Sequence, residues 1–385
     1  MTKRLAMNET ESYKGFELGP IRPPSEAESL LIRVTRNCPW NRCTFCPVYK
    51  DATFSRRPVE HVLRDIDTVK RCVDIIVAAK RNGDSPNRTL AQSTISDLHA
   101  EHAAYQFVAG GMKSIFLQDG NSLIIKPEDL IRILRHLTFC FPTVTRITSY
   151  GRSQTIAKIS DDHLLEMADA GLNRIHIGLE SGADRVLALV KKGSDKATQI
   201  QAGTKVKKAG IELSEYVMPG LGGKRYSREH ALETADALNQ INPDFIRLRS
   251  LALPPTAPLT QQYRSGDFEP VGEVGMAEEL LLFIDALDGI TSTIASDHVL
   301  NLFNEVDGVL PADKGKMMRP IEEFLRLPPY EQMLFCIGRR THRVARLKDL
   351  RNPSVRNNVE RLCEQIGATP DNMDEKIERI VQRFI

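Results

Sequence analysis

The sequence predicts an α/β protein, a partial (β/α)6 TIM-like barrel followed by an α-helical C-terminal region. Short apolar segments alternate with helical segments from about residue 30 to residue 259, as the strands and helices of a parallel sheet do. Six such units are present, which favours an open, partial barrel over a closed eight-stranded one. Beyond Gln261 the strand signals stop and only helical patterns continue.

Six strands are expected because each segment is short, apolar-rich and bounded by turn residues. They are Leu30–Val34, Ser114–Gln118, Val144–Ser149, Arg174–Leu179, Glu212–Val217 and Phe245–Ser250. The intervening helices carry apolar residues at helical spacing and are Pro58–Asn82, Pro127–Leu137, Asp161–Ala170, Ala183–Val190, Lys196–Ala209 and Ser227–Leu238. The first of these begins at a proline and stops before Gly83, as helices commonly do.

Three parts are predicted along the chain. Residues 1–28 form an N-terminal extension, residues 29–262 the barrel, and residues 263–385 the helical region. The expected helices of the last part are Met276–Ala286, Asp313–Phe324, Pro329–Ile337, Ser354–Ile366 and Met373–Phe384. Residues 82–96 are rich in turn formers and predict a loop.

The composition is that of an ordinary soluble protein, with 41% hydrophobic and 26% charged residues. A net charge of +2 makes no general case for nucleic-acid or membrane binding. No apolar run approaches the roughly 20 residues that span a bilayer, and the N-terminus lacks a secretory signal pattern. Four cysteines are scattered in the sequence (Cys72, Cys140, Cys336 and Cys363), which fits a reducing compartment. We therefore expect a cytoplasmic protein.

Three further cysteines, Cys38, Cys43 and Cys46, follow directly after the first expected strand. The C-terminal ends of the strands are where barrel enzymes place their active sites. Three thiolates on one loop can hold an iron–sulfur cluster and leave one iron open to a ligand. A zinc site usually has four ligands in paired spacing, and no cysteine or histidine at such spacing follows. A disulfide framework fits the sequence still less.

The cysteine run resembles the motif of the radical S-adenosylmethionine (SAM) superfamily, including the aromatic Phe45 before the third cysteine. The usual spacing is Cys-x3-Cys-x2-Cys, whereas here four residues separate Cys38 from Cys43. The resemblance implies a [4Fe–4S] cluster, SAM chelated by its open iron, and hydrogen abstraction after reductive cleavage of SAM. The resemblance covers about residues 30–259. Within the superfamily, the chain is most similar to the branch that includes the elongator catalytic subunit, the methylthiotransferases and the oxygen-independent coproporphyrinogen oxidase.

Other segments at the ends of expected strands are similar to SAM-binding segments of that superfamily. An arginine such as Arg152 can pair with the SAM carboxylate in a fork. Glu180, in a Gly-x-Glu-Ser-Gly segment, can accept hydrogen bonds from ribose hydroxyls, while Ser181 could also cap the next helix. By this resemblance, the residues expected to bind cofactor are Phe45, Gln118, Asp119, Gly120, Asn121, Tyr150, Arg152, Glu180, Ser181 and Met218. The family's usual Gly-Gly-Glu is not reproduced at residues 118–121, so that match is one of position.

The substrate side offers three charged residues on the fifth and sixth expected strands: Glu215, Arg247 and Arg249. Charges on otherwise buried strands are costly unless they are paired. They therefore project into the barrel to bind a polar or anionic substrate, or they form a structural Glu–Arg pair. The sequence favours neither interpretation.

The partners follow from the resemblance. We expect a small-molecule substrate, an electron donor such as flavodoxin or ferredoxin, and no membrane, with a nucleic acid as the less favoured partner. Two alternatives stay open: a radical SAM enzyme that modifies RNA, and a non-catalytic iron–sulfur or metal-binding protein. The sequence does not identify the substrate or the product.

Overall fold

The computed structural model describes residues 11–382. Eight strands form a sheet in the hydrogen-bonded order β1-β4-β5-β6-β7-β8-β9-β10. They are β1 (Leu30–Arg33), β4 (Ser114–Gln118), β5 (Arg146–Gly151), β6 (Leu172–Glu180), β7 (Glu212–Val217), β8 (Phe245–Leu248), β9 (Thr293–Ala295) and β10 (Gly308–Val309). Strands β1, β4, β5 and β6 pair in parallel, as do β7, β8 and β9. This confirms the expected α/β class, because the six predicted strands follow one another in chain order.

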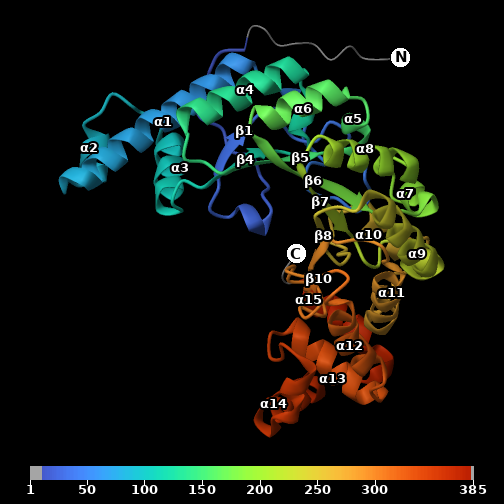
Figure 1. The fold of residues 1–385 in the computed structure, drawn as a ribbon. Coiled ribbons are helices and arrows are strands. Elements are labelled where there is room, and N and C mark those ends of the chain that lie inside the picture. The colour runs from blue at the N-terminus through green and yellow to red at the C-terminus, as the bar shows by residue number, and fades with distance from the viewer. Residues whose placement is uncertain (1–10, 383–385) are drawn as a thin grey trace. The chain divides into compact units, whose positions relative to one another are not determined.

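Helices connect and cover the strands (Figure 1). Those up to the end of β8 are α1 (Val59–Asn82), α2 (Pro86–Ala91), α3 (Leu98–Ala109), α4 (Pro127–Cys140), α5 (Ser153–Ile156), α6 (Asp161–Asp169), α7 (Asp184–Leu189), α8 (Lys196–Lys208) and α9 (Gly223–Ile241). The later ones are α10 (Pro258–Ser265), α11 (Glu273–Ala286), α12 (Lys314–Leu325), α13 (Pro329–Arg340), α14 (Pro353–Ile366) and α15 (Met373–Val381). The helical C-terminal region is therefore present as expected.

The described residues fall into two compact units. The first unit comprises residues 11–41, 48–177 and 204–213, and the second comprises residues 42–47, 178–203 and 214–382. In the first unit, α1, α4 and α6 lie along one side of β1, β4 and β5 (Figure 1). Ile32 pairs in register with Leu117, and both side chains are fully buried. Burying such apolar faces against helices is what holds an α/β layer together.

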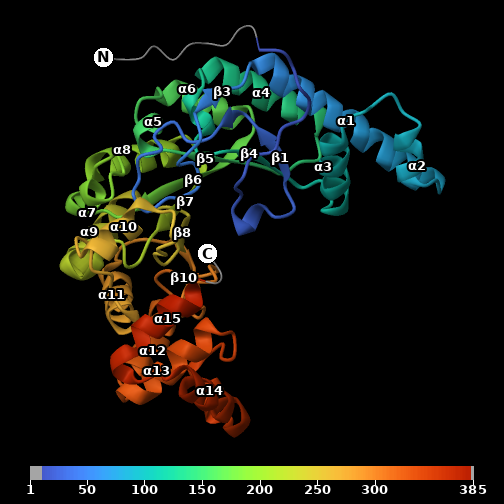
Figure 2. The ribbon, with the colours of Figure 1, turned by 180° about the vertical axis from the view of Figure 1, so that it is seen from behind.

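The second unit carries the C-terminal helices, which Figure 2 shows from behind. Phe303, Phe324 and Phe335 are buried there, with ring centroids 5.5 to 5.9 Å apart. Aromatic rings at such distances add specific contacts to the area they bury. This cluster ties α12 and α13 to the segment that precedes them.

Some elements differ from the expectation. The region after Gln261 is not purely helical, because β9 pairs with β8 in parallel and β10 pairs with β9 antiparallel. Strands of three and two residues are too short to show an alternating pattern. Residues 82–96 contain the short helix α2, and the third strand begins at Arg146. Phe384, the expected end of the last helix, lies outside the described residues. Among the described helices, none has the length and apolar character needed to cross a membrane.

Candidate functional site

The loop that carries the cysteines is closed at its base by a short ladder. Strands β2 (Thr35–Arg36) and β3 (Ser55–Arg56) pair antiparallel, so the two ends of the loop lie side by side in the first unit. The side chain of Asn37 donates to the carbonyl of Thr53 at 2.6 Å across the base. Asn37 has a left-handed backbone with φ of 68°, which asparagine tolerates better than most residues. Contacts within the protein are therefore sufficient to fix the base of the loop.

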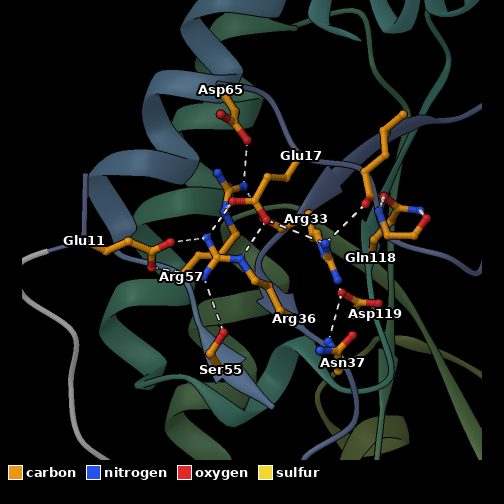
Figure 3. A network of polar contacts seen from close by, with 12 residues as sticks. Glu11, Glu17, Arg33, Arg36, Asn37, Ser55, Arg57, Asp65, Gln118 and Asp119 are labelled. Carbon is orange, nitrogen blue, oxygen red and sulfur yellow. Dashed lines mark hydrogen bonds and ion pairs between the residues drawn. The ribbon is translucent and has the colours of Figure 1, made fainter. Parts of the chain in front are cut away.

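A network of arginines and carboxylates surrounds this base (Figure 3). Arg36, on β2, forms ion pairs with Glu11 and Glu17 at 2.8 and 2.6 Å. The hydrogen bond from Arg36 lowers the pKa of Glu11, so this carboxylate stays ionised. Arg57, just after β3, pairs with the buried Asp65 of α1 at 2.6 Å. These pairs fix β2 and β3 to the first unit.

Asp119, at the exit of β4, is the central acceptor beneath the loop (Figure 3). It is fully buried and accepts hydrogen bonds from Arg33 Nε at 2.6 Å, the Asn37 backbone amide at 3.2 Å and Tyr49 Oη at 2.9 Å. Its neighbour Gly120 lies beside Cys38: a Cβ added there would stand 3.4 Å from the Cys38 Cβ. Asp119 therefore holds the loop, and Gly120 packs its backbone closely against Cys38 and Tyr49.

The side chains of Gln118 and Asn121 also form hydrogen bonds to other groups of the protein. Gln118 Oε1 accepts from the Gly19 amide at 2.8 Å, and its Nε2 donates to the Gly19 and Ile21 carbonyls. Asn121 donates to Thr155 Oγ1 at 2.8 Å and accepts from the Arg152 amide at 3.3 Å. Their role in the structure is to position the chain on either side of the β4 exit.

Arg152 lies at the end of β5 with its guanidinium over the ring of Trp40, 5.1 Å from the centroid. Trp40 stands between Cys38 and Cys43 in the sequence. Tyr150 packs edge-on against Phe116, with centroids 5.1 Å apart. A cation over an indole face is a favourable contact. The first unit therefore brings Cys38, Trp40 and Arg152 to neighbouring strand exits.

The rest of the cysteine loop belongs to the second unit. The Thr44 amide donates to the Val190 carbonyl at 2.9 Å, and the Thr44 carbonyl accepts from the Leu259 amide at 2.8 Å. Phe45 packs against a buried apolar cluster formed by Ala183, Val186, Val190, Met218 and Leu221. The backbone on either side of Cys43 and Cys46 is thus tied down, while both thiols are partly exposed.

Glu180, the last residue of β6, forms an ion pair with Lys192 at 3.0 Å, and both side chains are largely buried. Its backbone is left-handed, with φ of 64°, a conformation that costs energy for a residue other than glycine. Gly178 makes room for the pair, because a Cβ there would lie 2.2 Å from Glu180 Oε1. Lys192 in turn stands 5.7 Å from the ring centroid of Phe45. The Gly-x-Glu-Ser-Gly segment and the cysteine loop therefore meet within one unit.

Ser181 belongs to a buried network that the sequence did not reveal. Its hydroxyl accepts from the Ala183 amide at 3.0 Å and lies 2.8 Å from His230 Nδ1. His230 Nε2 lies 3.1 Å from the Met218 carbonyl and 3.7 Å from the carboxylate of Glu279. A neutral imidazole that accepts from Ser181 and donates to Met218 satisfies both contacts. No local motif marks His230, since its partners come from distant strand exits.

Glu215, in the middle of β7, is 1% exposed. Burial raises the pKa of its carboxyl well above the usual value, which nearby Lys192 partly offsets and Glu180 reinforces. Oε2 has no hydrogen-bond partner among the described residues. A raised pKa of this origin favours the protonated form of the carboxyl.

Arg247 and Arg249 occupy different environments. Arg247 is buried and pairs with Asp297 at 2.7 Å, so the structural pair exists but with a partner other than Glu215. The strand register explains this, because Glu215 pairs with Ile246 and therefore points to the opposite face from Arg247. Arg249 is exposed. Together with burial, it lowers the pKa of His298 to about 4.

The candidate residues thus divide between the units. The first unit holds Cys38, Gln118, Asp119, Gly120, Asn121, Tyr150 and Arg152. The second holds Cys43, Phe45, Cys46, Glu180, Ser181, Glu215, Met218, Arg247 and Arg249. Within each unit they gather at strand exits or in the cysteine loop, except Glu215 and Arg247, which lie within strands.

Residues 32–238 match the Radical SAM superfamily, a stretch of more than half of the 385 residues. The chain belongs to the radical SAM superfamily. It is accordingly a radical SAM iron–sulfur enzyme, and its cofactors are a [4Fe–4S] cluster and SAM.

Two curated relatives match beyond this stretch. They are the tRNA uridine(34) acetyltransferases of Methanocaldococcus infernus and Methanocaldococcus jannaschii, 24% and 22% identical over 319 residues. Each alignment covers 78% of this chain but only 57% and 56% of the relative. The chain therefore spans little more than half the length of these relatives. Among solved structures, Methanocaldococcus infernus Elp3 with an N-terminal deletion is 19% identical, covers 58% of this chain and 57% of that one, and has a TM-score of 0.42.

The residues of the cysteine loop fit an iron–sulfur cluster. Cys38, Cys43 and Cys46 are partly exposed, whereas the other four cysteines are buried. Thiolates are the ligands that iron–sulfur clusters require. The buried hydroxyl of Thr44, next to Cys43, has no hydrogen-bond partner among the described residues. A loop that is anchored through its backbone and carries three partly exposed cysteines suits a bound inorganic centre.

Proposed function

We propose that this enzyme holds its cluster through Cys38, Cys43 and Cys46 and abstracts hydrogen from a polar substrate. The observation that carries this proposal is the three-cysteine loop inside the stretch that matches the superfamily. When bound, the cluster and SAM supply the one-electron cleavage of a carbon–sulfur bond that starts hydrogen abstraction. An electron donor such as flavodoxin or ferredoxin is part of the proposal, because the cluster must be reduced in each cycle that consumes SAM.

Protein groups would orient SAM around this loop. Arg152 offers a guanidinium that can pair with a carboxylate, and its stacking on Trp40 holds that group in place. Glu180 offers a carboxylate to ribose hydroxyls, with Lys192 holding its orientation. Phe45 and the apolar cluster under it offer a dry surface to the flat adenine. Asp119 and the Ser181–His230 network would not contact SAM themselves. They would fix the backbone that carries the groups that do.

Arg249 is the group best suited to contact substrate among the three charged candidates. Arg247 is already paired and Glu215 is buried with a raised carboxyl pKa, whereas the Arg249 side chain is exposed. A small polar or anionic substrate fits such a cation.

RNA modification is the second candidate function. It is favoured by the two tRNA uridine(34) acetyltransferases, whose similarity extends over 319 residues rather than only the superfamily stretch. A net charge of +2 gives RNA binding little general support.

Anaerobic turnover tests both functions. The reconstituted enzyme, reduced with dithionite, should release 5′-deoxyadenosine from SAM, and Cys43→Ala should release none while Cys363→Ala behaves as wild type. Addition of bulk tRNA or of pooled small polar metabolites then separates the candidates, since the true substrate should accelerate deoxyadenosine release. Equal release by the Cys43→Ala variant would refute the cluster assignment.

A further inference from the structure

Three side chains that commonly bind zinc converge on helices of the first unit, outside the residues considered above. Asp67 comes from α1, and His136 and Cys140 come from α4. His136 Nε2 lies 2.7 Å from Asp67 Oδ1 and 3.6 Å from Cys140 Sγ. One carboxylate oxygen, one imidazole nitrogen and one sulfur all lie within 4.8 Å of one another. They are the donor types of zinc sites in proteins.

The helices place these groups by simple geometry. His136 and Cys140 are four residues apart, so they share one face of α4. α1 packs against α4, and Figures 1 and 2 both show the two helices side by side. Cys140 is buried at their contact, His136 is partly exposed and Asp67 is exposed. An ion could therefore reach the three atoms from solvent, with the sulfur at the inner end.

One ring nitrogen of this cluster faces two partners. Nε2 can donate to Asp67 or accept from the Cys140 thiol, but a single ring nitrogen cannot do both. A bound metal ion would instead accept a lone pair from each of the three atoms. With Asp67 and Cys140 ionised and His136 neutral, the ligands carry two negative charges, which balance one divalent cation.

The local field also favours a cation. Cys140 is the last residue of α4, where the helix carries partial negative charge, and His136 stands one turn before it. The last turn of the helix contains no lysine or arginine. On the facing helix, Lys70 is already paired with Asp74 at 2.6 Å, which reduces its repulsion of an incoming ion.

We propose that Asp67, His136 and Cys140 form a zinc-binding site with water as the fourth ligand. Zinc is favoured over magnesium or calcium because those ions prefer ligand sets made of oxygen alone. Binding displaces the thiol proton of Cys140, so the affinity for zinc rises with pH.

The test uses the cluster-reconstituted enzyme dialysed anaerobically against micromolar zinc chloride. Zinc content and X-ray absorption at the zinc edge report on the zinc without interference from iron. We expect one zinc per chain, coordinated by one sulfur and otherwise by nitrogen and oxygen. Cys140→Ser should remove the sulfur from the zinc shell and, like Asp67→Asn, weaken binding at least ~tenfold, since even outer-shell changes cost 10–100-fold.

A matched control lies on α1. Cys72→Ser removes another buried thiol, which lies outside the ligand set. This variant should retain zinc with the wild-type sulfur shell. Absence of bound zinc in the wild-type enzyme would overturn the proposal, as would two or more sulfur ligands, which would place the zinc on other cysteines. If Cys140→Ser fails to fold, unchanged zinc affinity in Asp67→Asn decides against the site.

Discussion

Glu215 is a carboxyl group placed where ionisation is costly. It is buried in the middle of β7, and Oε2 finds no hydrogen-bond partner among the residues described. Burial is the main cause of its raised pKa, and the attraction of Lys192 offsets only part of the effect. Close to the Glu180–Lys192 pair, the enzyme therefore carries a carboxyl group whose protonated form is favoured. Such a group can donate a hydrogen bond, which a carboxylate cannot.

Replacing Glu215 by glutamine should change how stability depends on pH. The pKa is near 4.5 in the unfolded chain and higher when folded. Between these two values the unfolded chain has released a proton that the folded enzyme retains, so rising pH destabilises the fold by up to about 1.4 kcal/mol per pH unit. The Glu215→Gln variant has no carboxyl to ionise at this position, so its stability does not fall with pH for this reason. Urea unfolding at pH 5.5 and pH 8 should show the variant gaining stability relative to wild type as pH rises.

The exposed Glu278, on α11 of the same unit, provides a matched control. Glu278→Gln should keep the same stability difference from wild type at both pH values. A pH-independent difference for Glu215→Gln as well would show that Glu215 is ionised in the folded enzyme.

Comparing the stability of Arg247 and Arg249 variants distinguishes a structural role from a role in substrate binding. Arg247→Ala removes a buried guanidinium from its charge-assisted contact with the half-exposed Asp297 and should lower the free energy of unfolding by about 1.5 kcal/mol. Arg249→Ala removes an exposed side chain and should leave stability within about 0.5 kcal/mol of wild type. Anaerobic urea titrations measure both. Equal losses of stability would place Arg249 in the fold and remove it as a substrate contact.

The sequence located these charged residues but not their partners. Alternation along a strand shows which neighbours share a face, and it correctly marked Glu215 and Arg247 as charges on buried strands. The register between β7 and β8 then sets them on opposite faces. Asp297, the partner of Arg247, lies 50 residues further along the chain. Neither the register nor so distant a contact leaves a local signal.

Among the secondary-structure elements, the strands of the barrel were the most predictable. All six expected strands are present because each is a short apolar run between turn residues. β9 was missed, although Ile294 pairs in register with the buried Ile246, because three residues cannot display a period. The helix α10 was also missed, since its proline-rich start reads as a turn. The domain boundaries at residues 28 and 262 stay predictions.

Asp119 links two elements, the exit of β4 and the base of the cysteine loop. Asp119→Asn keeps the shape but removes the charge that Arg33 faces at 2.6 Å. Breaking one side of a largely buried ion pair should cost about 3 kcal/mol. Because Asn37 and Tyr49 bind the same carboxylate, the loop should also loosen and retain less iron after reconstitution. Urea unfolding and iron content measure the two effects.

Asp74→Asn is the control for this change, since it breaks an exposed Lys70 pair of the i,i+4 type. That variant should lose no more than about 0.5 kcal/mol and should bind iron as the wild type does. If Asp119→Asn matches it in both measurements, the network of Figure 3 does not support the loop.

For the molecule as a whole, the radical SAM assignment predicts that SAM stabilises the reconstituted enzyme. A ligand that binds only the folded state adds about 2.7 kcal/mol at one hundred times its dissociation constant. The melting temperature should therefore rise with SAM in the wild type and stay constant in Cys43→Ala, which lacks a cluster to chelate it.

The same measurement tests Glu180 without confusing binding with folding. Glu180→Gln breaks the pair with Lys192 and so lowers the baseline stability, but the informative quantity is the shift that SAM adds to each variant's own baseline. This shift should shrink for Glu180→Gln, because a lost charge-assisted hydrogen bond costs about 1.5–3 kcal/mol of affinity. Glu233→Gln, which removes one of the two carboxylates paired with Lys196, should keep the full shift. If both variants keep it, Glu180 serves only to hold Lys192, and the ribose must be recognised by other groups.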